Sequence, residues 1–122
     1  MVLNASIPPN VAQAPATLSY AQAAVRAVEC EMAADPTVVV LGEDVGRGGI
    51  FGQYAGLQQR FGASRVIDTP ISELGIVGMG VGAALTGMRP IVEIQFSDFL
   101  CQAMDQVVNQ AAKLHFMVGG QA

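Results

Sequence analysis

Charged residues are scarce in this chain of 122 residues: Asp, Glu, Lys and Arg make up 13% of it, against about 25% in soluble domains. The six basic residues are outnumbered by ten acidic ones, for a net charge of −4. This balance argues against nucleic-acid binding, which needs a basic surface. Hydrophobic residues reach 52%, so the composition predicts apolar faces that are buried against something outside this sequence.

Cysteines and long hydrophobic runs are also few. Cys30 and Cys101 cannot build a disulfide framework and have no CxxC spacing for a metal site. The longest uncharged apolar run, Leu74 to Met88, has 15 residues and five glycines, whereas a bilayer span needs about 20 apolar residues. We therefore expect a buried helix there and no membrane segment.

The first 17 residues contain three prolines but no basic residue. They match neither the charged start of a signal peptide nor an Arg-rich transit peptide. We expect a flexible lead-in over 1–17, an ordered domain over 18–122, and a cytoplasmic location.

Helices and strands are expected to alternate from Leu18 onward. Ser19 and Gln22 fit a capping box at the start of the first helix. The run Thr37–Leu41 is β-branched without alternation, which is typical of a parallel strand buried on both faces. The expected helices cover 19–35, 53–61, 72–86 and 97–118, and the expected strands cover 37–41, 65–68 and 90–96.

This order predicts an α/β domain with an open, mostly parallel sheet flanked by helices. Ligands of such sheets gather at the carboxyl ends of the strands, so the loops after Leu41, Asp68 and Phe96 are the candidate binding loops. The chain stops just after a helix, where the alternation requires another strand. We therefore expect a truncated domain.

Glu73 is the sharpest candidate for chemistry, because it follows a strand, a proline turn and the helix-capping Ser72. Its commoner role would be that of an ordinary first-turn acid, which the helix dipole favours. Glu43 and Asp44 follow the first strand and could equally be solvated loop residues.

Two further features have a structural interpretation. The run from Gly78 to Ala83 matches the GxGxx(G/A) fingerprint, but it lies inside a helix and not in the strand-to-helix turn that a dinucleotide needs. Gly78 and Gly82 are better explained by close packing of a neighbouring helix or strand. His115, the only histidine, is expected on the surface or in packing rather than in catalysis.

Six short segments, taken in their order along the chain, carry a family resemblance. They are Leu41–Asp44, Asp68–Glu73, Val81–Ala84, Gly87–Pro90, Glu93–Phe96 and Asp105–Lys113. Together they resemble the beta subunit of thiamine-diphosphate-dependent 2-oxoacid dehydrogenases of the pyruvate, branched-chain and acetoin types. The resemblance covers about 18–120 and implies an incomplete pyrimidine-binding domain of the thiamine-diphosphate-binding fold, without the family's C-terminal domain.

The resemblance also assigns roles. Glu73 would contact a ring nitrogen of the cofactor's aminopyrimidine and share a proton with it, which activates the cofactor. Ile71, Gln95 and Phe99 would line the pocket around that ring, and Glu43 would be an acidic residue in a tunnel between paired active sites. No metal ligand is expected in this chain, because the family holds the Mg²⁺ of thiamine diphosphate on the alpha subunit.

The implied partners are that alpha subunit in an α₂β₂ assembly, a second beta subunit, a small 2-oxoacid and a lipoyl acyltransferase core that receives the acyl group on lipoamide. The fragment alone is expected to be inactive. The alternatives are an acetoin dehydrogenase subunit, a transketolase-like or deoxyxylulose-phosphate-synthase-like pyrimidine domain, and a non-catalytic association module.

Overall fold

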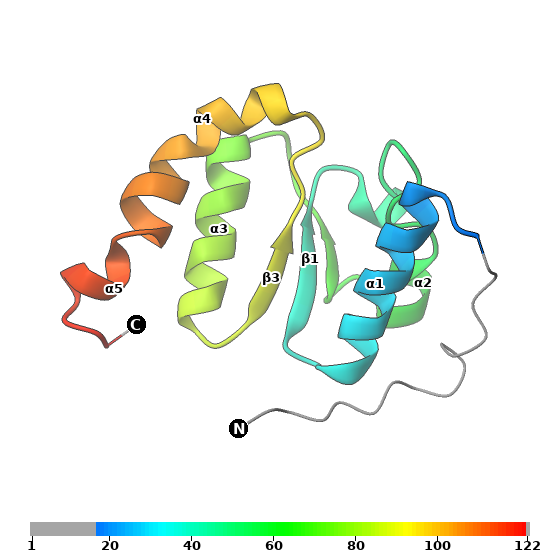
Figure 1. Ribbon diagram of the computed structural model, residues 1–122, viewed down its shortest axis with the longest axis horizontal. Helices are drawn as coiled ribbons and strands as arrows, with labels where there is room; N and C mark the ends of the chain where they lie inside the picture. The colour runs from blue at the N-terminus through cyan, green and yellow to red at the C-terminus, as the bar shows by residue number, and fades with distance from the viewer. Residues whose placement is uncertain (1–16, 122) are drawn as a thin grey trace.

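The computed structural model of the chain describes residues 17–121, as a small α/β unit (Figure 1). The expected lead-in therefore lies, apart from residue 17, outside the described residues. The helices and strands are α1 Tyr20–Ala34, β1 Val38–Gly42, α2 Leu57–Phe61, β2 Val66–Asp68, α3 Glu73–Leu85, β3 Arg89–Val92, α4 Leu100–Asp105 and α5 Leu114–Met117. Single 3₁₀ turns cover Val45–Arg47 and Ser97–Phe99, and a π-helical turn covers Gln106–Ala111.

The three described strands form one parallel sheet in the order β2-β1-β3. Val40 of β1 pairs with Val66 on one side and with Ile91 on the other. Every residue of β1 is buried, as expected of a central strand covered on both faces. The prediction of an open parallel α/β sheet is confirmed.

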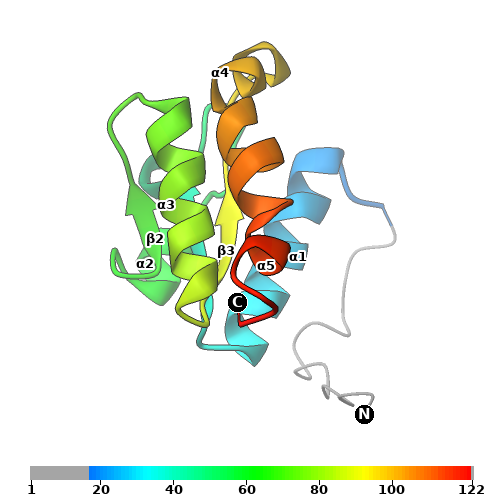
Figure 2. The ribbon, with the colours of Figure 1, turned by 90° about the vertical axis from the view of Figure 1, so that its left-hand side faces the viewer.

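Helices cover both faces of the sheet, and alternate residues of β1 serve the two layers (Figures 1 and 2). Val38 and Val40 pack with Met32 of α1 in one core. Val39 and Leu41 pack with Ile76 of α3 in the other. Because side chains alternate across a strand, one five-residue strand anchors both layers.

The connection from α1 to β1 is fixed by local hydrogen bonds. The Ser19–Gln22 capping box is present at the start of α1. At its end, the Asp35 carboxylate accepts hydrogen bonds from the Thr37 hydroxyl at 2.6 Å and from the Thr37 backbone N–H at 2.8 Å. These two bonds hold the pKa of Asp35 below its ordinary value.

Two expected elements are shorter than the sequence indicated. The second helix begins at Leu57 and not at Gln53, because Gly52 and Gly56 have φ values of 73° and 79°, which interrupt a right-handed helix. The last strand ends at Val92, although the Glu93 N–H still donates to the Leu41 carbonyl at 2.9 Å. Since β1 ends at Gly42, the segment 93–96 has no described strand to pair with further.

The last expected helix is divided into α4, the π-helical turn and α5. Of its residues, only Ala103 is buried. Most of the expected apolar stripe is exposed, with Met104 at 40% and Val108 at 42%. No helix within residues 17–121 is both long enough and apolar enough to cross a membrane.

Glycines bring α3 close to its neighbours, although not with the expected spacing. A Cβ atom on Gly80 would lie 2.5 Å from Cγ2 of Val92 in β3, and one on Gly78 would lie 3.2 Å from Oε1 of Gln106. Gly82 has no described atom within 4 Å of its Cβ position. The close packing therefore rests on Gly78 and Gly80.

Candidate functional site

All five residues to which the family resemblance assigned a cofactor-binding role line one pocket. Its volume is about 620 Å³, and it lies at the carboxyl ends of the strands, where parallel sheets bind ligands. The lining residues are Glu43, Ile71, Ser72, Glu73, Leu74, Gln95, Phe99 and Gln102. The topology thus brings together residues from the three candidate loops. Their roles toward a ligand remain predictions.

Glu73 is the first residue of α3, and only 7% of it is exposed. Ser72 caps the helix by accepting a hydrogen bond from the Gly75 N–H at 3.3 Å. The positive end of the helix dipole stabilises a carboxylate at this position. Within residues 17–121, no hydrogen-bond donor is found for the Glu73 carboxylate, so a donor that enters the pocket can bind it.

Glu43 approaches the same pocket from the end of β1. Burial, and then the neighbouring carboxylates of Glu73 and Asp44, raise the pKa of Glu43 above its ordinary value of 4.5. Two acidic groups therefore share one pocket, and the carboxylate of Glu73 disfavours ionisation of Glu43. Such a pair is a common feature of sites that hold or move protons.

The loop that carries Glu43 has a tight turn at Asp44, which has a positive φ of 56°. The Asp44 carbonyl accepts hydrogen bonds from the backbone N–H groups of Arg47 at 3.1 Å and Gly49 at 2.9 Å. The Gln95 amide lies 3.4 Å from the Glu43 carbonyl and 3.5 Å from Oδ2 of Asp44. Gln95 thus connects the segment after β3 to the loop after β1.

The remaining walls are apolar and lie partly open. Ile71 is 81% exposed at the rim, and Phe99 is 42% exposed. The Phe99 ring meets that of Phe96 edge-to-face at 5.6 Å, and Phe96 meets Phe51 in the same way at 6.1 Å. Gln102 also lines the pocket but was missed by the sequence analysis. Its only signal was its place one turn after Phe99 in the last helical segment.

Replacing Glu43 by Gln is expected to change how stability depends on pH. Because the folded pKa of Glu43 is raised above 4.5, its ordinary value and that of the unfolded chain, its contribution to stability is fully present below 4.5 and is lost as pH rises through the folded pKa. A Gln side chain does not ionise and so loses no stability as pH rises. The free energy of unfolding of Glu43→Gln should therefore increase relative to that of wild type between about pH 4 and about pH 7. Urea unfolding at about pH 4 and about pH 7 measures this, with Glu31→Gln on the exposed side of α1 as control. If the free energies of unfolding of Glu43→Gln and wild type differ by the same amount at both pH values, the prediction is contradicted.

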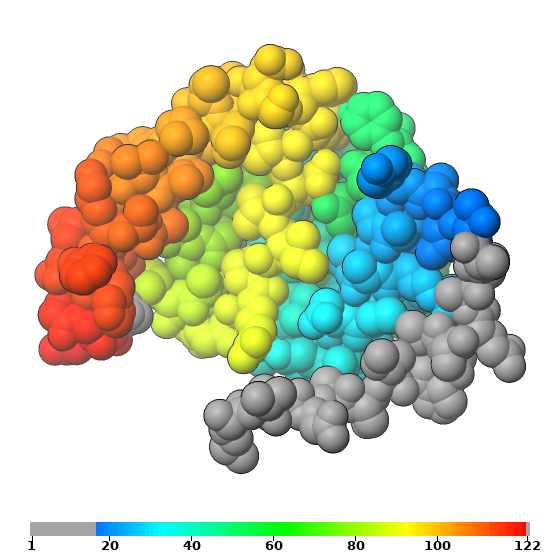
Figure 3. Space-filling model, viewed as in Figure 1, coloured from blue at the N-terminus to red at the C-terminus, as the bar shows by residue number. Residues whose placement is uncertain are grey.

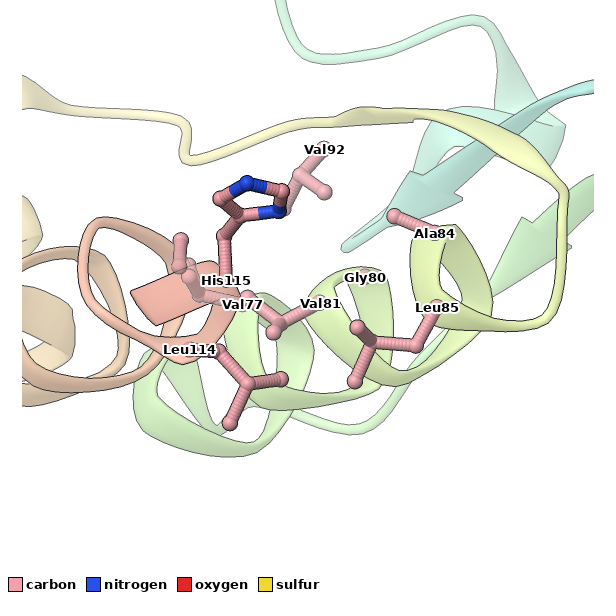
Figure 4. Close-up of a pocket in the computed structure, with 9 residues that line it drawn as sticks. Val77, Gly80, Val81, Ala84, Leu85, Val92, Leu114 and His115 are labelled. Carbon is pink, nitrogen blue, oxygen red and sulfur yellow. The ribbon is translucent and has the colours of Figure 1, made fainter. Parts of the chain in front are cut away.

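A second pocket holds His115. It has a volume of about 430 Å³ and lies between α3, Val92 and the last helical segments. Figure 4 shows the His115 ring next to Val92, with Leu114, Val81 and Leu85 around the cavity. In the space-filling view, the orange and red last segments stand apart from the yellow β3 region, with green α3 between them (Figure 3). The walls are apolar except for His115, which is itself exposed, in keeping with the expected surface position of this residue.

No group of three His, Cys, Asp or Glu side chains among the described residues is arranged to hold a metal ion. The acidic residues of the first pocket therefore do not by themselves form a metal centre. The pocket combines a buried carboxylate, a second acid with a raised pKa, an amide and an aromatic ring. These groups can exchange hydrogen bonds with a polar ligand, and the ring of Phe99 can pack against a flat one.

The fold and the pocket define an open parallel α/β domain with a ligand-sized pocket at the carboxyl ends of its strands. The transketolase pyrimidine-binding-domain family matches residues 16–121, so the chain belongs to that family. It is 51% identical over 100 residues to the 2-oxoisovalerate dehydrogenase subunit beta of Bacillus subtilis, an alignment that covers 81% of this chain and 31% of that protein.

Two other relatives agree. The chain is 55% identical over 84 residues to the pyruvate dehydrogenase E1 component subunit beta of Leifsonia xyli, covering 68% of this chain and 25% of that protein. It is 42% identical over 118 residues to the acetoin:2,6-dichlorophenolindophenol oxidoreductase subunit beta of Bacillus subtilis, covering 86% and 34%. The chain thus spans about a third or less of these relatives, and the family resemblance of the six segments is confirmed.

Proposed function

We propose that the chain is part of the beta subunit of a thiamine-diphosphate-dependent 2-oxoacid dehydrogenase. The reaction would be the oxidative decarboxylation of a 2-oxoacid, with transfer of the acyl group to lipoamide. The observation that carries the proposal is the gathering of Glu43, Ile71, Glu73, Gln95 and Phe99 around one pocket in a member of the pyrimidine-binding family. The names of the relatives support the same reaction class.

The donor set of the pocket fits the aminopyrimidine of thiamine diphosphate. When bound, the cofactor supplies the carbanion chemistry, while the protein supplies binding and orientation. The buried Glu73 carboxylate, which lacks a donor among the described residues, would hold a proton at a ring nitrogen. Phe99 and Ile71 would pack against the ring. Glu43 would be an acidic residue in a tunnel that connects this active site to a second one.

The rest of the cofactor would be bound by the partner. We place the diphosphate and its Mg²⁺ on an alpha subunit, in an α₂β₂ assembly that also contains a second beta subunit and passes the acyl group to a lipoyl acyltransferase core. On this proposal the chain is inactive by itself. A cytoplasmic setting agrees with the free thiols of Cys30 and Cys101.

Acetoin is the second candidate substrate, because one relative is an acetoin oxidoreductase subunit. A transketolase-like reaction has no such support among the named relatives. A module that only associates with partners does not account for two carboxylates, those of Glu43 and Glu73, that line one pocket.

The test is reconstitution of a full-length version with its cognate alpha subunit, Mg²⁺ and thiamine diphosphate. Reduction of an artificial dye is then measured with pyruvate, with branched-chain 2-oxoacids and with acetoin. We expect activity with one of these substrate classes, and none when the cofactor or the alpha subunit is omitted. A complex that assembles and binds the cofactor but reduces no dye with any of the substrates would overturn the proposed reaction.

A further inference from the structure

A partly buried hydrogen-bonded cluster joins the loop after β1 to the segment that follows β3, and it belongs to none of the sequence motifs as a unit. The Glu93 carboxylate accepts a hydrogen bond from the Tyr54 hydroxyl at 2.6 Å through Oε2, and one from the Gln53 amide at 3.1 Å through Oε1. Gln53 is itself fixed, because its Oε1 accepts the Phe51 N–H at 2.9 Å. Both oxygens of Glu93 are therefore held by the glycine-rich loop that follows β1.

The cluster is tightly placed. Tyr54 is only 6% exposed. Burial, and then the hydrogen bond to Glu93, raise the pKa of Tyr54, so its hydroxyl stays a donor at neutral pH. A Cβ atom on Gly42 would lie 2.6 Å from that of Glu93, so only glycine lets the end of β1 approach Glu93 this closely.

Glu93 begins the segment that carries two pocket residues. After Val92 the chain leaves the sheet, and Gln95 and Phe99 follow within six residues of Glu93. Sheet hydrogen bonds hold this segment only as far as the Glu93 N–H. Farther along, the edge-to-face contacts of Phe51, Phe96 and Phe99 connect it to the same loop.

We propose that Gln53, Tyr54 and Glu93 form a positioning clamp for the cofactor pocket. The clamp fixes the start of the segment 93–99 against the loop, and so sets where Gln95 and Phe99 stand relative to Glu43. None of the three clamp residues lines the pocket, so they act through Gln95 and Phe99 and not by contact with the ring. This inference rests on the proposed function, because it assigns the clamp to that same site.

The first test is Tyr54→Phe in the full-length complex with its alpha subunit. The variant keeps the ring and removes only the hydroxyl that holds Glu93. We expect the Kd for thiamine diphosphate, measured by calorimetry at fixed Mg²⁺, to rise about tenfold, the scale of a hydrogen bond to a charged group. At saturating cofactor, kcat should stay within about twofold of wild type, because Glu73 and Glu43 are unchanged.

Tyr20→Phe is the matched control, since Tyr20 is 97% exposed and loses the same hydroxyl. It should bind the cofactor like wild type. Thermal unfolding in the absence of cofactor shows whether Tyr54→Phe still folds. If that variant is folded and binds with the wild-type Kd, the clamp has no positioning role and the inference is overturned.

The second test is an exchange of groups that restores the bonds. Glu93→Gln alone replaces a charged group with two acceptor oxygens by a neutral amide with one, so it cannot accept from both Gln53 and Tyr54 and should weaken cofactor binding. Adding Gln53→Glu provides an acceptor for the new amide and another for the Phe51 N–H, so E93Q/Q53E should recover most of the wild-type Kd. No recovery in a folded double variant would contradict the clamp. Failure of wild type to bind thiamine diphosphate would instead overturn the proposed function, so the two failures are distinguishable.

Discussion

Glu73→Gln should lower the turnover of the reconstituted enzyme by about 10²- to 10⁴-fold, the usual contribution of a positioned acid–base group. The amide keeps the shape of the side chain but cannot take up or hold a proton at a ring nitrogen. Glu73 is buried at the start of α3 and lines the pocket. We expect the helix to persist, because Ser72 still caps it and the dipole contribution of one acid is only about 0.3–1 kcal/mol.

The measurement is 2-oxoacid-dependent dye reduction, with Glu31→Gln on α1 as the matched control. A structural readout accompanies it: the carboxylate of Glu73 is one cause of the raised pKa of Glu43, so in Glu73→Gln the pKa of Glu43 should fall toward its ordinary value. Carbon-detected NMR titration would follow that group. More than a tenth of wild-type turnover in the variant would contradict the role given to Glu73.

The parts of the fold that the sequence predicted are those set by local rules. The Ser19–Gln22 box and the Asp35–Pro36 stop bound α1, and the uninterrupted β-branched run of β1 is buried as expected. Glu73 could be placed at a helix start because a strand, a proline and a capping serine precede it. Each of these signals lies within a few residues of the feature that it predicts.

The parts that escaped prediction depend on distant contacts. Tyr54 and Glu93 are 39 residues apart in the sequence and meet only because the loop after β1 folds back on the end of β3. The length of β3 likewise depends on where its partner β1 ends. Gln102 lines the pocket because α4 begins directly after Phe99, and nothing in the residue itself marks it.

The low charge of the chain has a counterpart in the structure. Large apolar residues are exposed along α3 and the last helical segments, with Phe116 at 83% and Met117 at 73%. More of them surround the pocket, including Ile71 and Leu74. These exposed surfaces are the apolar faces that the composition led us to expect.

Arg65→Met is expected to cause the largest loss of stability, about 2–4 kcal/mol. Nη2 of Arg65 lies 2.9 Å from the Met32 carbonyl oxygen, 2.8 Å from that of Asp35 and 2.7 Å from that of Val38. One guanidinium thus satisfies carbonyls at the end of α1 that have no helical partner, and its charge complements the negative end of the helix dipole. Met keeps the apolar stem and removes the guanidinium donor from all three carbonyl oxygens, of which only that of Asp35 keeps another donor among the described residues, the Val38 N–H at 3.2 Å.

Arg60→Met is the matched control, because both arginines lie over the Phe61 ring, Arg60 at 5.1 Å and Arg65 at 5.3 Å. Arg60 is paired with Glu29 on the surface, and exposed pairs contribute about 0–1 kcal/mol. Urea unfolding followed by far-UV circular dichroism separates the two variants, and Arg65→Lys should fall between wild type and Arg65→Met, because an ammonium lacks the planar fork of the guanidinium. Equal losses for Arg60→Met and Arg65→Met would mean that the contact with Phe61, and not the three carbonyls, accounts for the stabilisation. A larger loss of unfolding free energy for Arg65→Met than for Arg60→Met would show that one side chain, from the turn before β2, holds α1 against β1. Because the loop that carries Glu43 follows β1, this side chain would also help to position Glu43 in the pocket.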